Sequence, residues 1–201
     1  MNRAALALIF SASMLIPLSS AAATVTVFNA TLDGLQEVPA NASPGTGFAI
    51  VTIDDAALTM QVQAFFSGLI SNTTASHIHC CAPVGSNAGV ATQTPSFFNF
   101  PLGVQSGAMD QTFDMTLASS YRAGFITANG GTTASAFVAL TTGMAAGNAY
   151  FNIHTVVYPG GEIRGQLAAV PEPSTWAMML LGFGTIGVAM RRSRRLAPAT
   201  A

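Results

Sequence analysis

All three histidines of the chain lie in two short motifs whose spacing suits metal binding. His77 and His79 are separated by one residue, and His154 follows much later in Asn152-Ile153-His154. On a β-strand, residues i and i+2 project from the same face, which would place the first two Cα atoms about 6.5 to 7 Å apart. Imidazoles at this spacing can reach one ion. His77 and His79 are therefore candidate metal ligands.

A third ligand can come from the second motif. Ala149 and every second residue after it are apolar up to position 153, which is typical of a half-buried strand. This alternation leaves Tyr150, Asn152 and His154 on the polar face. His154 therefore becomes the third candidate ligand if the two strands lie close together.

The two cysteines are adjacent, at positions 80 and 81, and cannot form an ordinary unstrained bridge with each other. Cys80 would point away from the histidines, whereas Cys81 would approach them if the chain bends. Imidazole combined with thiolate favours copper(I) or zinc. Two alternatives stay open: the histidines are hydrogen-bonding framework, and the cysteines are reduced thiols that pack as small apolar groups. The candidate metal set, for one copper or zinc ion, is His77, His79, His154 and Cys81.

The last apolar stretch of the domain follows a glycine-rich turn at 159–161 and contains Glu162 and Arg164. These two residues share one face of a strand. We expect them to tie that strand to its neighbour, or to Asn152, through charge-assisted hydrogen bonds. No Ser-His-Asp set, phosphate-binding loop or other catalytic motif is found in the sequence, so we predict no enzymatic activity.

The elements that must position these residues are mostly strands. Period-2 alternation is clearest over 58–66, and clusters of Gly, Pro, Asn and Ser separate the segments. An alanine-rich segment over 132–142, begun by threonine and ended by Gly143, predicts a short helix. We expect a mainly β fold: an antiparallel β-sandwich or barrel of about seven to eight short strands with one or two short helices. The expected strands are 24–32, 48–53, 58–66, 75–80, 111–117, 147–155 and 162–167.

Charge excludes some partners. Residues 24–170 carry seven acidic residues against Arg122 and Arg164, a net charge of −5, and the whole chain contains no lysine. Such a domain lacks the basic surface that binds nucleic acid or anionic lipid.

The first 23 residues resemble a secretory signal peptide. Arg3 precedes an apolar run, and small residues at 19–23 supply a cleavage site after Ala23 or one residue earlier. We therefore expect export and removal of this segment by signal peptidase.

The C-terminal segment has a Pro-Glu-Pro triad, an uncharged apolar span at about 175–190 and an arginine cluster. One interpretation is an ordinary single-pass membrane anchor, with the arginines on the cytoplasmic side. The order of the three parts instead resembles the PEP-CTERM sorting signal, which implies cleavage by an exosortase in a Gram-negative bacterium. The residues of this signal are Pro171, Glu172, Pro173, Arg191, Arg192, Arg194 and Arg195.

The domain between these segments resembles the CHRD domain, a family named after chordin. The similar motifs lie at 32–39, 45–47, 77–79, 150–155 and 160–165, and they span about residues 25 to 168 in the family's order. The resemblance implies an extracellular β-rich module without an established enzymatic activity. The expected organisation is a signal peptide at 1–23, a β domain at 24–170 and a sorting tail at 171–201.

Two functions follow from these features. The first is a non-catalytic binding or structural module at the cell envelope or surface, or outside the cell after cleavage, with extracellular polysaccharide or protein as partner. The second is a copper- or zinc-binding surface protein with a redox role. In both, the C-terminal segment contacts the membrane before processing.

Overall fold

A computed structural model describes residues 24–171, 179–183, 185–186 and 191. The predicted signal peptide lies outside the described residues. So do Glu172, Pro173, Arg192, Arg194 and Arg195 of the predicted sorting signal. Within the described residues, no helix is long and apolar enough to cross a membrane.

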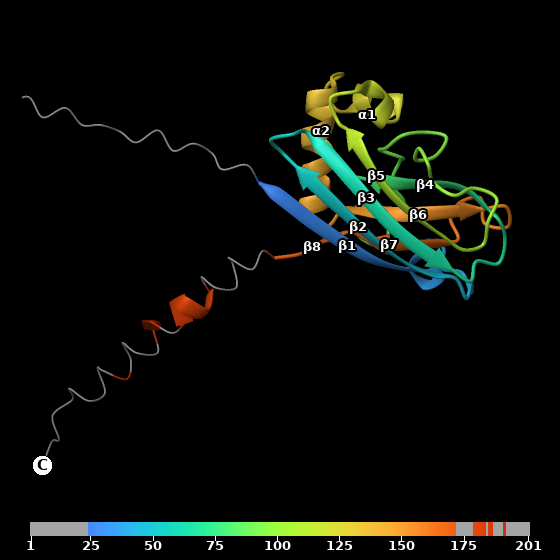
Figure 1. Ribbon diagram of the computed structural model, residues 1–201, viewed down its shortest axis with the longest axis horizontal. Coiled ribbons are helices and arrows are strands. Elements are labelled where there is room, and N and C mark those ends of the chain that lie inside the picture. The colour runs from blue at the N-terminus through green and yellow to red at the C-terminus, as the bar shows by residue number, and fades with distance from the viewer. Residues whose placement is uncertain (1–23, 172–178, 184, 187–190, 192–201) are drawn as a thin grey trace, which may run out of the picture.

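The domain is mainly β, as the sequence predicts. Within residues 24–171, eight strands form one antiparallel sheet in the order β4-β6-β7-β1-β2-β3-β5, and β8 also pairs with β1. The sheet curls into a half-barrel, with α1 (Ala123–Ala128) and α2 (Thr133–Ala145) gathered at one end (Figure 1). The strands are β1 (Val25–Asp33), β2 (Thr46–Asp54), β3 (Thr59–Ser67), β4 (Thr73–Cys80), β5 (Gly107–Asp114), β6 (Ala149–Thr155), β7 (Ile163–Gln166) and β8 (Ala168–Ala169).

Alternation of apolar and polar side chains decides which face of each strand is buried. In β3, Met60, Val62 and Phe66 are buried, whereas Gln61 and Gln63 are only partly so. The apolar faces of the curled sheet meet in one core. Its members include Phe28, Val51, Val62, Phe113, Ile78, Phe151 and Ile163.

Two α-helices close one end of the domain. Helix α2 (Thr133–Ala145) begins where the sequence predicts it, because Thr132 and Ser135 form a reciprocal capping box. It continues past Gly143 and packs against β4, β6 and β8. Helix α1 (Ala123–Ala128) has six residues, and the single-turn helices η1 (Gly34–Gln36) and η2 (Ala118–Ser120) have three each; their positions are not predicted from the sequence.

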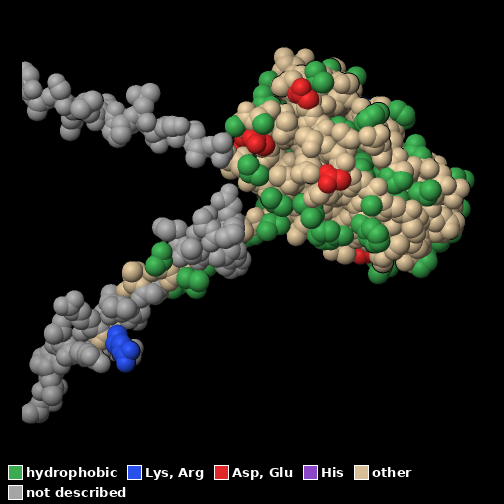
Figure 2. Space-filling model, in the orientation of Figure 1, with side chains coloured by type: hydrophobic (Ala, Val, Ile, Leu, Met, Phe, Trp, Pro, Cys, Tyr) green, Lys and Arg blue, Asp and Glu red, His purple; other side chains and the backbone are tan. Residues whose placement is uncertain are grey.

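The surface carries little charge. On the face shown in Figure 2, acidic side chains of the domain appear as separate spots, and no basic or histidine side chain of the domain is visible there. The histidines are buried instead.

Candidate metal centre

The two histidine motifs lie on neighbouring antiparallel strands. In the pairing of β4 with β6, His77 is opposite Asn152, His79 is opposite Tyr150, and His154 is opposite Ala75. Because directly opposed residues of paired strands share a face of the sheet, all three histidines project from the same side. This is the side away from Phe151 and the core.

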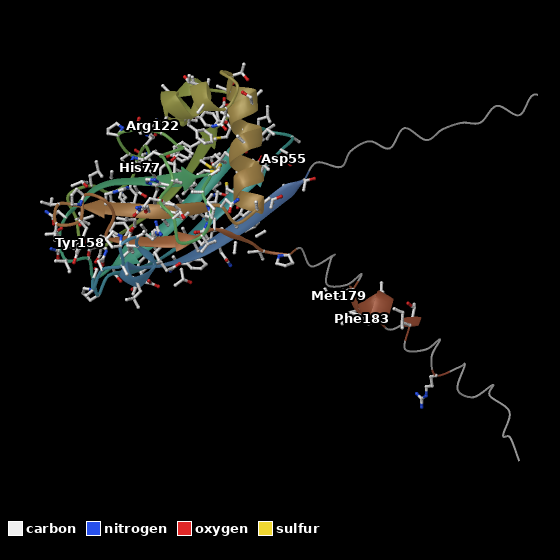
Figure 3. The ribbon with its side chains drawn as sticks, turned by 180° about the vertical axis from the view of Figure 1, so that it is seen from behind. Asp55, His77, Arg122, Tyr158, Met179 and Phe183 are labelled. Carbon is white, nitrogen blue, oxygen red and sulfur yellow. A yellow bond between two sulfur atoms is a disulfide. The ribbon has the colours of Figure 1, made fainter. Side chains whose placement is uncertain are left out.

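Loops cover this polar face, so both faces of β6 are buried along its whole length. The carbonyls of Ala88 and Pro95 approach from the segment after β4, and that of Pro159 approaches from the loop between β6 and β7. Seen from behind, His77 on β4 lies in the same half of the domain as Tyr158, and Asp55 lies at the far end (Figure 3). The histidines are 7 to 8% exposed.

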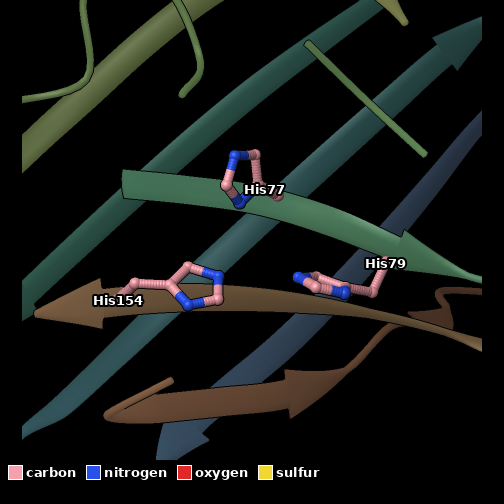
Figure 4. A group of neighbouring side chains, drawn as sticks. All are labelled: His77, His79 and His154. Carbon is pink, nitrogen blue, oxygen red and sulfur yellow. The ribbon is translucent and has the colours of Figure 1, made fainter. Parts of the chain in front are cut away.

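The three rings turn toward one space between β4 and β6 (Figure 4). The centroid of His77 lies 5.2 Å from that of His154 and 5.9 Å from that of His79, and the centroids of His79 and His154 are 5.7 Å apart. One ring nitrogen of each histidine lies within 4.8 Å of the other two. Three nitrogens bound to one ion at about 2.0 to 2.1 Å would be about 3.3 to 3.6 Å apart, so ligation requires the rings to approach by about 1 Å.

Hydrogen bonds fix which nitrogen of each ring carries the proton. His77 Nε2 lies 2.8 Å from the carbonyl of Pro95, His79 Nδ1 lies 2.9 Å from that of Ala88, and His154 Nδ1 lies 3.0 Å from that of Pro159. A carbonyl oxygen can only accept, so each of these nitrogens donates an N–H. The second nitrogen of each neutral ring therefore keeps a free lone pair.

Those second nitrogens have no partner. His77 Nδ1, His79 Nε2 and His154 Nε2 are buried and make no hydrogen bond. A buried polar atom without a partner costs about 1 to 3 kcal/mol. One ion bound by three lone pairs would satisfy all of them. The outer hydrogen bonds have the form usual around metal sites, where the second ring N–H of a ligand donates to a fixed acceptor.

The electrostatics keep the rings neutral. Burial lowers the pKa of His77 to about 4, assisted by the nearby His154. Burial also lowers the pKa of His79 to about 4 and is the main cause of the lowered pKa of His154. Neutral imidazole is the form that ligates a metal, so the rings are ready for binding at neutral pH.

The structure does not bring Cys81 to the histidines. Its sulfur is bonded to that of Cys80 in a disulfide, so the expectation of two reduced thiols is wrong. The chain turns after β4 so that the side chain of Cys81 lies toward α2, near the carbonyl of Ala139, and a Cβ at Gly143 would collide with both sulfurs. A disulfide offers no thiolate for ligation.

Glu162 is fully buried and accepts three hydrogen bonds. The Ser43 hydroxyl, the backbone N–H of Ile70 and the Thr155 hydroxyl each donate to it at 2.6 Å. These contacts join the residue just before β7 to the end of β6 and to two segments distant in sequence, around Ser43 and Ile70.

Arg164 lies opposite Asn152 in the pairing of β6 with β7, on the same polar face. Its guanidinium donates to the Gln36 carbonyl and, at 2.9 Å, to the Asn87 side chain, and it lies 4.5 Å from the centre of the Tyr150 ring. His79, on the same face, also stacks on Tyr150, with a centroid distance of 4.9 Å. Arg164 is thus linked to the candidate centre through one aromatic ring.

The sequence singled out Glu37 only as part of a motif, yet it is the carboxylate closest to Arg164, at 4.0 Å. Burial raises its pKa to about 7, against the opposing effects of Arg164 and the Val38 N–H. One of its oxygens has no partner. Glu37 lines a cavity of about 400 Å³ together with Asn87, Tyr158 and Gly161. A buried acid paired with an arginine across 127 residues leaves no local sequence signal.

A curled antiparallel sheet of eight strands with a covered polar face defines a small β-rich domain. The chain belongs to the CHRD domain family, whose match covers residues 28–167. A PEP-CTERM protein-sorting motif matches residues 169–195. Both matches confirm the resemblances seen in the sequence. A search of curated proteins and a search of solved structures each found no match.

Proposed function

We propose that this chain is an exported surface protein whose CHRD domain binds one copper or zinc ion through His77, His79 and His154. The observation that carries the proposal is the convergence of three buried, unpartnered ring nitrogens, each on a ring held by a backbone carbonyl. A purely hydrogen-bonding framework would leave these nitrogens unsatisfied.

Location at the surface rests on the sorting motif. The CHRD domain together with the PEP-CTERM motif indicates an exported, exosortase-processed surface protein. Neither family is known for enzymatic activity, so the proposed role is binding rather than catalysis. We place the signal peptide at 1–23, the domain at 24–170 and the sorting tail at 171–201, in a Gram-negative bacterium.

Processing is tested by mass spectrometry of the native protein. We expect an N-terminus at Thr24 or within a residue or two, and loss of the segment from about Trp176 onward. Recovery of surface protein that retains Arg191 and the residues after it would contradict the sorting proposal.

Metal binding is tested by measuring the copper and zinc content of the exported protein. His77→Ala and His79→Ala should each lose most of the metal, and Gln63→Ala on the outer face of β3 is the matched control that should retain it. If the wild-type chain stays metal-free when offered either ion, the metal proposal fails. A non-catalytic structural or polymer-binding module would then be the function that remains.

A further inference from the structure

Resting on the proposed function, we infer that the three-histidine centre selects copper(I) over the divalent ions zinc(II) and copper(II). Imidazole accepts both copper and zinc, so the ligand type does not decide between them. The number of ligands and the charge around them do.

The centre offers three neutral ligands and no anionic one. Each outer ring nitrogen donates to a backbone carbonyl, and none of the three donates to a carboxylate. The residues found together with ligand atoms in reach of one ion are the three histidines, with no aspartate, glutamate or cysteine among them in the described part of the chain. A bound ion would therefore keep its full charge.

Nearby formal charges are mostly positive. Arg122 and Arg164 both act on His79 in the direction that disfavours added positive charge, and Arg122 does so on His77. Glu37, the acid on the same face, is 4.0 Å from Arg164, and burial holds its pKa at about 7. It is thus only partly ionised at neutral pH and already compensated by an arginine.

Desolvation then separates the ions by charge. The idealised cost of moving an ion out of water grows with the square of its charge, so a divalent ion pays about four times as much as a monovalent ion of equal size. The histidines are at least nine-tenths buried, so solvent screens this charge weakly. Copper(I) adds one uncompensated charge to this environment, whereas zinc(II) and copper(II) add two.

Ligand number points the same way. Protein-bound zinc almost always takes four ligands, and a three-histidine zinc site completes its shell with water. Copper(I) is stable with three ligands. Cys81, the residue that would add both a fourth ligand and a negative charge, is held in a disulfide on the side of α2. The geometry and the charge of the centre therefore agree on a three-coordinate monovalent ion.

The test is an anaerobic competition titration on the full chain, with copper(I) supplied as its bicinchoninate complex and zinc(II) through a zinc chelator of known affinity. We expect a dissociation constant for copper(I) at least 100-fold below that for zinc(II). Copper(II) added with ascorbate should be retained as an ion that gives no paramagnetic resonance signal and has three nitrogen neighbours in X-ray absorption. Equal or tighter binding of zinc(II), or bound copper that stays divalent under ascorbate, would overturn the inference while leaving metal binding intact. Absence of binding by every ion would instead contradict the proposed function.

Two variants test the charge argument. Asn152→Asp places a carboxylate between Tyr150 and His154 on the same face, with almost no change in shape, and should narrow the preference for copper(I) at least 10-fold. Arg122→Gln removes an exposed positive charge, does not endanger folding, and should narrow it in the same direction by a smaller factor. If the Asn152→Asp protein folds and its preference for copper(I) is unchanged, the charge argument is overturned. If that variant does not fold, an unchanged preference in Arg122→Gln would do so.

Discussion

The two halves of the sheet bury their outer faces to different extents. In the half formed by β2, β3 and β5, the core-facing side chains are buried, and the outward ones are largely polar and partly or fully exposed. There Asp110 accepts hydrogen bonds from Gln61 and Gln63 at the surface. In the half formed by β4, β6 and β7, loops cover the outer face, so β6 is buried on both sides.

This difference coincides with the distribution of buried polar atoms that lack hydrogen-bond partners. Among the described residues, all the buried side-chain atoms without a hydrogen bond belong to the covered half and its loops. They are Glu37 Oε1, His77 Nδ1, His79 Nε2, Asn152 Oδ1 and His154 Nε2. Burying polar groups is costly unless partners satisfy them, so an exposed outer face needs no such groups. The covered half is therefore where we place binding.

The two halves should differ most in stability when one carboxylate in each half is replaced by alanine. Glu162→Ala removes three short hydrogen bonds from a fully buried carboxylate and leaves their donors unpaired. We expect the free energy of unfolding to fall by about 3 to 5 kcal/mol in urea titrations followed by circular dichroism. Asp110→Ala, on the exposed face of β5, should leave the unfolding midpoint unchanged. Similar effects of the two substitutions would remove the distinction between the halves.

A smaller loss is expected for Arg164→Ala. The substitution removes the hydrogen bonds to Gln36 and Asn87 and the contact with the Tyr150 ring. Thermal melts should show a destabilisation of about 1 to 3 kcal/mol. Arg122→Ala is the matched control, because Arg122 is exposed. An unchanged midpoint for Arg164→Ala would mean that this residue is kept for binding rather than for stability.

The pH dependence of stability in the metal-free protein separates the buried titratable groups of the covered half. His77 and His79 have a pKa of about 4 when folded and an ordinary value of 6.5, so the unfolded state binds protons first and their contribution to stability is lost as pH falls from 6.5 to 4. Glu37 has a folded pKa of about 7 and an ordinary value of 4.5, so its contribution is lost as pH rises through that interval. The two opposing contributions partly cancel.

Glu37→Gln removes the contribution of Glu37 to the pH dependence of stability. Between pH 6.5 and 4.5, the variant should lose stability more steeply than the wild type as pH falls, by at most about 1.4 kcal/mol per pH unit. Thermal melts in the presence of a chelator measure the slopes. Parallel curves would show that Glu37 is not buried as described.

The fold could be predicted from the sequence more completely than the side-chain contacts within the covered half could. Alternation located seven strands to within a few residues because one face of each meets the core, as in β3. The six-residue helix α1 has no periodicity long enough to detect. The candidate centre was predictable as a set of histidines, since strand geometry places His77 and His79 on one face. The pairing of Arg164 with Glu37 depends on a contact between distant segments and leaves no local pattern. The disulfide joins adjacent residues, so the sequence shows the cysteine pair, but the geometry usual for a bridge argues against the bond.

The most direct test of the candidate centre is the protonation state of each ring nitrogen, measured by long-range ¹H–¹⁵N nuclear magnetic resonance on the chain at neutral pH. In the metal-free protein we predict neutral rings, with the proton on Nε2 of His77 and on Nδ1 of His79 and His154. Addition of copper(I) should shift chiefly the three opposite nitrogens, His77 Nδ1, His79 Nε2 and His154 Nε2. Protonated rings, the reverse tautomers, or spectra unchanged by the ion would contradict a shared three-histidine metal centre.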